Sequence, residues 1–260
     1  MRTLIRNAVS HRHLLWNFVQ RDLRVKYRGT LLGYLWSLLE PLSMAAVYWF
    51  VFVVIAERGG PGYPLTVLLG VLPYTYFSSV VTGGANALSA NRGLIRRVYL
   101  PRELFVLAHL GTQTVVLGLS LGVVVPGWFV YGIVPEPVNL LWVPAAVVGL
   151  GTLAGGLGLA LSCVQVLYRD VGYVLKVLLR LAMYASPVIY PLSMVPESLR
   201  PMYLLNPLAV WISLVRTALA NDPLSVPPWA IGLSFAEAVA VAWVGAALFR
   251  RWQHQAVKYL

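Results

Sequence analysis

Six long apolar stretches, separated by clusters of charged residues, dominate the chain. They cover residues 34–56, 65–88, 104–126, 140–163, 171–190 and 229–249. Each is close to the ~20 residues that a helix needs to cross a bilayer. Every backbone polar group must be satisfied inside lipid, and alternating strands of about ten residues are absent, so the pattern predicts helices. We therefore expect an all-α membrane protein with six transmembrane helices over residues 31–260.

The first 30 residues have a different pattern and form a separate unit. Within residues 3–28, an apolar stripe recurs at helical spacing and polar residues occupy the other face. The stripe contains Leu4, Ala8, Leu15, Val19 and Leu23. The other face contains Arg6, His13, Asn17, Arg24 and Arg28. This spacing predicts an amphipathic helix in the membrane interface over residues 1–30, ended by Gly29. A solvated basic leader is the alternative, but it would not require the stripe.

The connection before the last span, residues 191–228, combines seven prolines with many apolar residues. An ordinary solvent loop would be more polar. Irregular backbone is tolerated at membrane depth where protein or water covers it. The segment therefore predicts short re-entrant helices on the outer side, with a surface cap as the alternative.

Composition excludes a water-soluble fold. Hydrophobic residues make up 59% of the chain and charged residues only 11%, whereas soluble domains carry about 25% charge. The single cysteine, Cys163, lies in an apolar run and is expected to pack in the core.

The net charge of +11 raises the possibility of nucleic-acid binding, but the positions of the charges indicate membrane topology instead. Seventeen of the twenty Lys and Arg residues fall on one side of a six-span arrangement, and only Arg58, Arg200 and Arg216 fall on the other. We therefore expect a multi-pass protein of the cytoplasmic (inner) membrane with both termini in the cytoplasm and no nucleic-acid partner.

The sequence lacks the motifs of an ATPase. A phosphate-binding loop needs a Lys followed by Ser or Thr among glycines, and the three lysines, Lys26, Lys176 and Lys258, precede Tyr, Val and Tyr. The four histidines are scattered, which argues against a metal site. We expect no catalytic residue, no metal and no cofactor in this chain.

Polar and aromatic residues in the spans are the candidates for a transport conduit, because charges inside a membrane are costly and sugar rings stack on aromatic faces. The candidate lining residues are Trp36, Glu40, Tyr48, Trp49, Tyr184 and Tyr190. An aromatic belt at the membrane surface is the alternative explanation for the aromatic residues. For Glu40, the alternative is a carboxylate near the interface at a proline bend.

Four blocks of sequence carry a family resemblance. They are RDLRVKYRGTLLGYLWSLLEP at 21–41, NRGLIRR through PRE at 91–103, YRD at 168–170 and YASPVIY at 184–190. In order and spacing they resemble the ABC transporter permeases that export O-antigen, teichoic acid and capsular polysaccharide.

This resemblance implies a homodimer bound to two copies of a separate ATPase subunit, which binds the ATP and Mg. It also implies that a short cytoplasmic coupling helix within 91–103 docks into that ATPase. The interface residues would be Asn91, Leu94, Ile95, Arg96, Arg97, Pro101 and Glu103. Leu94 and Ile95 are expected to be the apolar anchors, facing away from the bundle. The alternative is a positively charged membrane anchor without a partner.

The substrate implied by the resemblance is a polysaccharide linked to a polyprenyl diphosphate, whose tail stays among the membrane lipids. Its charges favour interfacial arginines, so Arg24 and Arg28 are the candidates for lipid-diphosphate access, with Arg97 in reserve. Two other functions stay open: a drug or lipid exporter permease of the related ABC family, and a membrane assembly protein that transports nothing.

Overall fold

The computed structural model describes residues 2–55, 62–98, 100–223 and 225–260, and these residues are helical wherever they form regular structure. The N-terminal helices are α1 (Arg2–Ser10) and α2 (Arg12–Tyr27). The long helices are α3 (Trp36–Trp49), α4 (Tyr63–Ala90), α6 (Glu103–Leu121), α8 (Trp142–Leu167) and α12 (Pro228–Lys258). The shorter ones are α5 (Arg92–Arg97), α7 (Val124–Tyr131), α9 (Val171–Ala185), α10 (Arg200–Tyr203) and α11 (Pro207–Ala220). Single turns at Gly33–Leu35, Phe50–Ile55, Asn139–Leu141 and Leu192–Met194 extend or connect them.

Five helical segments are long and apolar enough to cross a membrane, counted over the described residues. They are Gly33–Ile55, Tyr63–Arg97, Glu103–Tyr131, Asn139–Leu167 and Pro228–Lys258. These agree with five of the six predicted spans. The sixth, predicted over 171–190, is the shorter helix α9 with 15 residues. At 1.5 Å per residue α9 is about 22 Å long, less than the ~30 Å hydrocarbon core.

Proline explains why α9 stops early. Pro187 disfavours a helical conformation at the residue before it, and Ser186 is extended, with φ −115° and ψ 153°. Residues 186–190 therefore leave the helix while they are still inside the bundle, where Val188 is fully buried. The apolar stretch continued past the proline, and for that reason hydrophobicity alone overestimated the helix.

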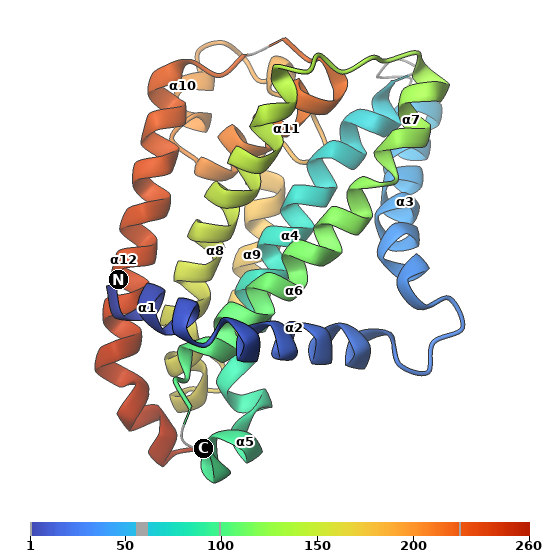
Figure 1. The fold of residues 1–260 in the computed structure, drawn as a ribbon. Coiled ribbons are helices and arrows are strands. Elements are labelled where there is room, and N and C mark those ends of the chain that lie inside the picture. The colour runs from blue at the N-terminus through green and yellow to red at the C-terminus, as the bar shows by residue number, and fades with distance from the viewer. Residues whose placement is uncertain (1, 56–61, 99, 224) are drawn as a thin grey trace.

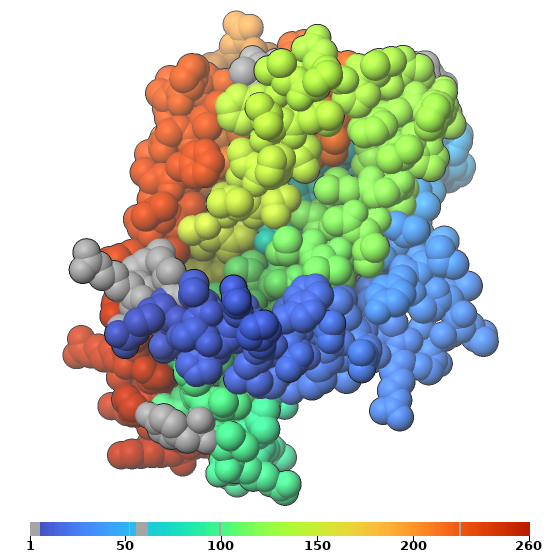
Figure 2. Space-filling view, in the orientation of Figure 1, coloured from blue at the N-terminus to red at the C-terminus, as the bar shows by residue number. Residues whose placement is uncertain are grey.

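The amphipathic N-terminal unit is present as two helices rather than one, with a break at His11. Figure 1 shows α1 and α2 running across the long helices. Figure 2 shows them on the outside of the bundle, with α5 and the C-terminal end of α12 extending past them. Phe18 and Val19 are buried, whereas Asn17, Arg24 and Arg28 are exposed. The predicted stripe is confirmed from Ala8 onward; the side chain of Leu4 lies outside the described residues.

The core has two parts along the bundle axis. The larger part joins α4, α8 and α11 with the segment after α9, and the smaller part lies where α2, α6 and the lower half of α12 meet. Cys163 is fully buried in the smaller part, as predicted. Close approach of α8 and α12 depends on Gly156, where an added Cβ would lie 2.6 Å from the backbone of Ala242.

The segment 191–228 is packed into the bundle rather than spread over it. Its main helix, α11, contacts α4, α8 and α12, and its residues Leu208 through Leu219 are buried. Figure 1 places this segment at the end of the bundle opposite to α5 and the C-terminus. A surface cap is thus inconsistent with the burial of α11.

Candidate diphosphate and coupling sites

The turn from α2 into α3 forms an arginine-lined pocket. Arg21, Arg24 and Arg28 line a surface pocket of about 670 Å³ together with Tyr34. Gly29 and Gly33, with φ of +74° and +51°, allow the chain to turn there, as predicted for Gly29. We call this the arginine pocket. The structure thus brings the two predicted diphosphate residues, Arg24 and Arg28, to one concave surface, whereas Arg97 lies on α5.

A second, smaller cavity of about 100 Å³ lies beside the arginine pocket, between α3, α4 and α6. Its wall includes Lys26, Tyr27, Trp36 and Glu40. The Tyr27 hydroxyl is buried there with no hydrogen-bond partner among the described residues. Desolvation lowers the pKa of the Lys26 ammonium, and the negative charge of Glu40 opposes that shift. Two of the predicted conduit residues, Trp36 and Glu40, therefore share a polar cavity near the arginine pocket.

The other predicted conduit residues lie elsewhere in the single chain. Trp49 lines an apolar groove between α3 and α7, and Tyr48 packs against the larger core. Tyr184 is exposed at the end of α9. The Tyr190 hydroxyl donates to the Tyr184 carbonyl at 3.0 Å and pairs with the Tyr203 hydroxyl at 3.1 Å. The single chain does not bring these six residues together.

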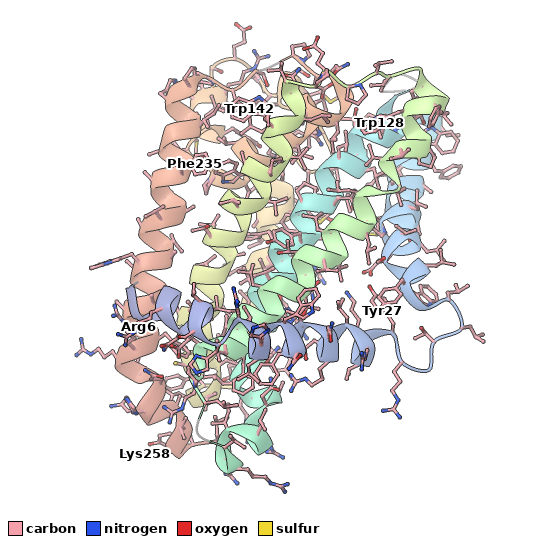
Figure 3. All side chains as sticks on the ribbon, viewed as in Figure 1. Arg6, Tyr27, Trp128, Trp142, Phe235 and Lys258 are labelled. Atoms are coloured by element: carbon pink, nitrogen blue, oxygen red, sulfur yellow. The ribbon has the colours of Figure 1, made fainter. Side chains whose placement is uncertain are left out.

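Basic side chains gather toward one end of the bundle, whereas aromatic side chains occur toward both. Figure 3 shows Trp128 and Trp142 near one end, and Arg6, Tyr27 and Lys258 toward the other. The Trp128 indole donates to the Leu219 carbonyl at 2.7 Å, which ties α7 to α11. Aromatic residues at both boundaries and cations concentrated at one are typical of a membrane-embedded helical bundle.

The predicted coupling segment, 91–103, contains α5 and an irregular return to α6. Arg96 and Arg97 are exposed. Leu94 and Ile95 pack partly against the smaller core, rather than facing away from the bundle as predicted. The reason is that α5 is only six residues long and its apolar side must cover the ends of the neighbouring helices. Of the arginines in this segment, Arg92, Arg96 and Arg97 are exposed and Arg102 is partly buried, so the three arginines of α5 are the charges best placed to reach a partner.

Both ends of the coupling segment are bonded to the N-terminal helices. The Arg21 guanidinium donates to the Asn91 side-chain oxygen at 2.9 Å. The Asn7 amide donates to the Glu103 carboxylate at 2.7 Å, and Glu103 is buried, with 7% of its surface exposed. Pro101 is partly buried between these two contacts. Asn91, which caps α5, is thus bonded to α2, and Glu103, the first residue of α6, is bonded to α1.

We expect Glu103→Ala to loosen α1 from the bundle, because it leaves the Asn7 amide unpaired at a cost of about 1–3 kcal/mol. Limited proteolysis of the N-terminal residues should become faster. Glu103→Gln keeps an acceptor oxygen and is the matched control, which should stay as protected as wild type. Equal protection of the alanine variant would show that the Asn7 bond does not hold α1.

The sequence did not single out Arg216 on α11. Its side chain is buried, and its guanidinium donates only to backbone carbonyls: to Thr66 at 3.1 Å, to Pro187 at 2.7 Å, to Val188 at 2.7 Å and to Tyr190 at 2.9 Å. The available signal was an arginine within the apolar run 207–220. Because residues 207–220 lie in the predicted connection 191–228, the sequence pattern places Arg216 among the charges on the outer side of the membrane.

Among the residues that the structure describes, no group of three His, Cys, Asp or Glu side chains is placed to hold a metal ion. The arginine pocket is lined by cations, which suits phosphate rather than a metal ion.

Comparison with known proteins identifies the family. Residues 13–220 match the family described as ABC-2 type transporter. The chain is 35% identical over 207 residues to the O-antigen export system permease protein RfbA of Myxococcus xanthus, which covers 79% of each chain. It is 26% identical over 248 residues, 95% of each chain, to the protein of that name from Klebsiella pneumoniae. It is also 27% identical over 201 residues to the polysialic acid transport protein KpsM of Escherichia coli, covering 76% of this chain and 78% of that one. A helical bundle with these apolar segments and this match over most of its length belongs to the ABC-2 type transporter family, as a membrane permease.

Proposed function

We propose that this chain is the permease subunit of an ABC exporter that moves a polysaccharide linked to polyprenyl diphosphate across the cytoplasmic membrane. The observation that carries the proposal is the arginine pocket, in a chain whose relatives are named as O-antigen and polysialic acid transporters. Arg24 and Arg28 suit a diphosphate headgroup, because the lipid tail can stay in the membrane while the charges are paired. Arg21 in the same pocket already pairs with Asp22 at 2.8 Å.

The topology that accompanies this function has six crossings. In it α9 and residues 186–190 together make the fifth crossing, and α11 is a re-entrant helix on the outer side. With an even number of crossings, both termini and α5 lie on the cytoplasmic side, in agreement with the bias of basic residues. Burial of the irregular segment 186–190 supports this arrangement, because non-helical backbone at membrane depth must be covered by protein.

The working exporter would be a homodimer with two copies of a separate ATPase subunit. Exposed apolar side chains along α3 and α9, such as Leu42, Val47, Val177 and Leu181, suit contact with lipid or with the second copy. The candidate conduit residues Trp36, Tyr48, Trp49 and Tyr184 would then come from both protomers. ATP and Mg would be bound by the partner, since the chain has no phosphate-binding loop.

Deleting the gene in its native host tests the proposal. We expect loss of the surface polysaccharide and accumulation of its lipid-linked form inside the cell, with both restored by the wild-type gene. Normal surface polysaccharide combined with new drug sensitivity or an altered lipid composition would favour the drug or lipid exporter instead. Failure to co-purify any ATPase subunit would favour an assembly protein.

A further inference from the structure

A second basic pocket lies at the α5 end of the bundle, away from the arginine pocket. It has a volume of about 480 Å³ and is formed by α4, the turn from α8 into α9, and the end of the chain. We call it the α8–α9 pocket. None of its lining residues belongs to α2 or α3, so it is separate from the proposed diphosphate site.

Three cations from three different elements line this pocket. They are Arg92 from α5, Arg169 from the α8–α9 turn and Lys176 from α9. No described carboxylate lies within ion-pair distance of any of them. The Lys176 ammonium lies 5.8 Å from the ring centroid of Tyr173, which orients it beside the pocket. Convergent, unneutralised cations of this kind attract an anion with several oxygens, such as a phosphate.

Uncharged polar groups line the same pocket. Thr82 and Asn86 line it from within the apolar helix α4, and Asn86 is exposed there. A polar side chain in a span is costly unless it faces a polar cavity or a ligand. The amide oxygen of Gln165 is buried and accepts no hydrogen bond from the described residues. It is therefore available to a hydroxyl donor, of the kind that glycerol and sugar headgroups carry.

The outer side of α9 adds an apolar surface directly above the pocket. Tyr173 lines the pocket, and Val174, Val177 and Leu181 follow it as exposed apolar side chains. A basic, hydroxyl-accepting cavity next to an exposed apolar helix matches an amphiphile with an anionic head and hydrocarbon chains. Basic pockets between transmembrane helices on the cytoplasmic side bind anionic lipid headgroups by this combination.

We propose that the α8–α9 pocket binds the phosphate-bearing headgroup of a lipid, with Arg169 and Lys176 pairing the phosphate and Asn86 and Gln165 contacting its hydroxyl groups. The phosphate is that of an anionic phospholipid or that of a carrier-lipid diphosphate, and the two probes below distinguish these sources. Binding at this pocket does not depend on what the protein exports.

The test measures binding to purified protein in phosphatidylcholine nanodiscs. A short-chain phosphatidylglycerol and inorganic pyrophosphate are the two probes. We expect the double variant Arg169→Gln and Lys176→Gln to bind at least one probe about tenfold more weakly than wild type. Arg180→Gln removes an exposed charge from the same helix without touching the pocket, and should bind within twofold of wild type. Asn86→Leu keeps every charge and should also weaken binding, which covers the case in which the double variant does not fold.

The two probes separate the two sources of phosphate. Loss of phosphatidylglycerol binding alone assigns the pocket to a phospholipid, and loss of pyrophosphate binding assigns it to a diphosphate; either result supports the site. Unchanged affinity for both probes in the double variant and in Asn86→Leu would overturn it. So would an equal loss in Arg180→Gln, because general charge attraction would then explain the binding.

Discussion

Replacing Arg216 by Met should lower the free energy of unfolding by about 3–5 kcal/mol, because the change removes a buried guanidinium that makes four hydrogen bonds to backbone carbonyls and leaves those buried carbonyls with one donor fewer. Four carbonyl oxygens would lose their donor, those of Thr66, Pro187, Val188 and Tyr190. Such a loss corresponds to a melting temperature lower by roughly 10 °C for a chain of this size. Thermal unfolding of the purified protein in detergent, followed by tryptophan fluorescence, measures it.

The size of the effect follows from how completely the surroundings are built around this guanidinium. At Gly70 on α4, an added Cβ would lie 1.9 Å from the Val188 carbonyl oxygen and 2.6 Å from the Arg216 side chain. The Tyr63 hydroxyl donates to the Ile189 carbonyl at 2.7 Å, in the same short segment. Arg216 on α11 is thus hydrogen-bonded both to α4 and to the irregular segment 186–190.

Two further variants sharpen the measurement. Arg216→Lys keeps the charge, but an ammonium cannot reproduce the planar fork of donors, so its loss should be intermediate. Arg180→Met removes an exposed arginine and should stay within about 0.5 kcal/mol of wild type. An Arg216→Met protein that melts with wild type would mean that the four carbonyls find water or other donors.

The sequence predicted the features that depend on local pattern. Five spans, the amphipathic N-terminal unit and the burial of Cys163 follow from hydrophobic periodicity and length, which are properties of short stretches. The grouping of Arg24 with Arg28 followed from their helical spacing, and the structure places both in one pocket.

Features that depend on contacts between distant segments could not be read in the same way. The role of Arg216 requires carbonyls from residues 26 to 150 positions away. The inward orientation of Leu94 and Ile95 depends on how α5 meets the ends of its neighbours. The early end of α9 has a local signal, because Pro187 disfavours a helical conformation at Ser186. The hydrophobic stretch continues past this proline, so hydrophobicity alone predicts a longer helix.

The second large effect concerns Arg96 and Arg97, two of the three exposed arginines of α5. Because Leu94 and Ile95 support the smaller core, replacing them would damage the fold as well as any docking. The double variant Arg96→Glu and Arg97→Glu instead changes exposed side chains and leaves the packed side of α5 intact. We expect a stable, inserted protein that exports no polysaccharide.

Loss of export is expected for two reasons. Under the proposed function, reversing two charges removes basic surface that α5 would present to the ATPase subunit, and we expect at least about tenfold less of that subunit to co-purify. The Arg21–Asn91 bond links the start of α5 to α2, and the Asn7–Glu103 bond links the start of α6 to α1. Among the described residues these are the side-chain hydrogen bonds between the segment 91–103 and the N-terminal helices, so we expect a change in how the segment is held to act on α2 and the arginine pocket.

The matched control reverses two other exposed charges, in the variant Arg6→Glu and Arg12→Glu on α1 and α2. It has the same net charge as the α5 variant but leaves α5 unchanged, so it should retain the ATPase subunit. Protein level and melting temperature are compared first, then co-purification and surface polysaccharide. If the α5 variant keeps its ATPase and exports normally, force enters the permease at another place. The turn 168–170 is then the next position to change, because it is the other loop at this end of the bundle and it lines the α8–α9 pocket through Arg169.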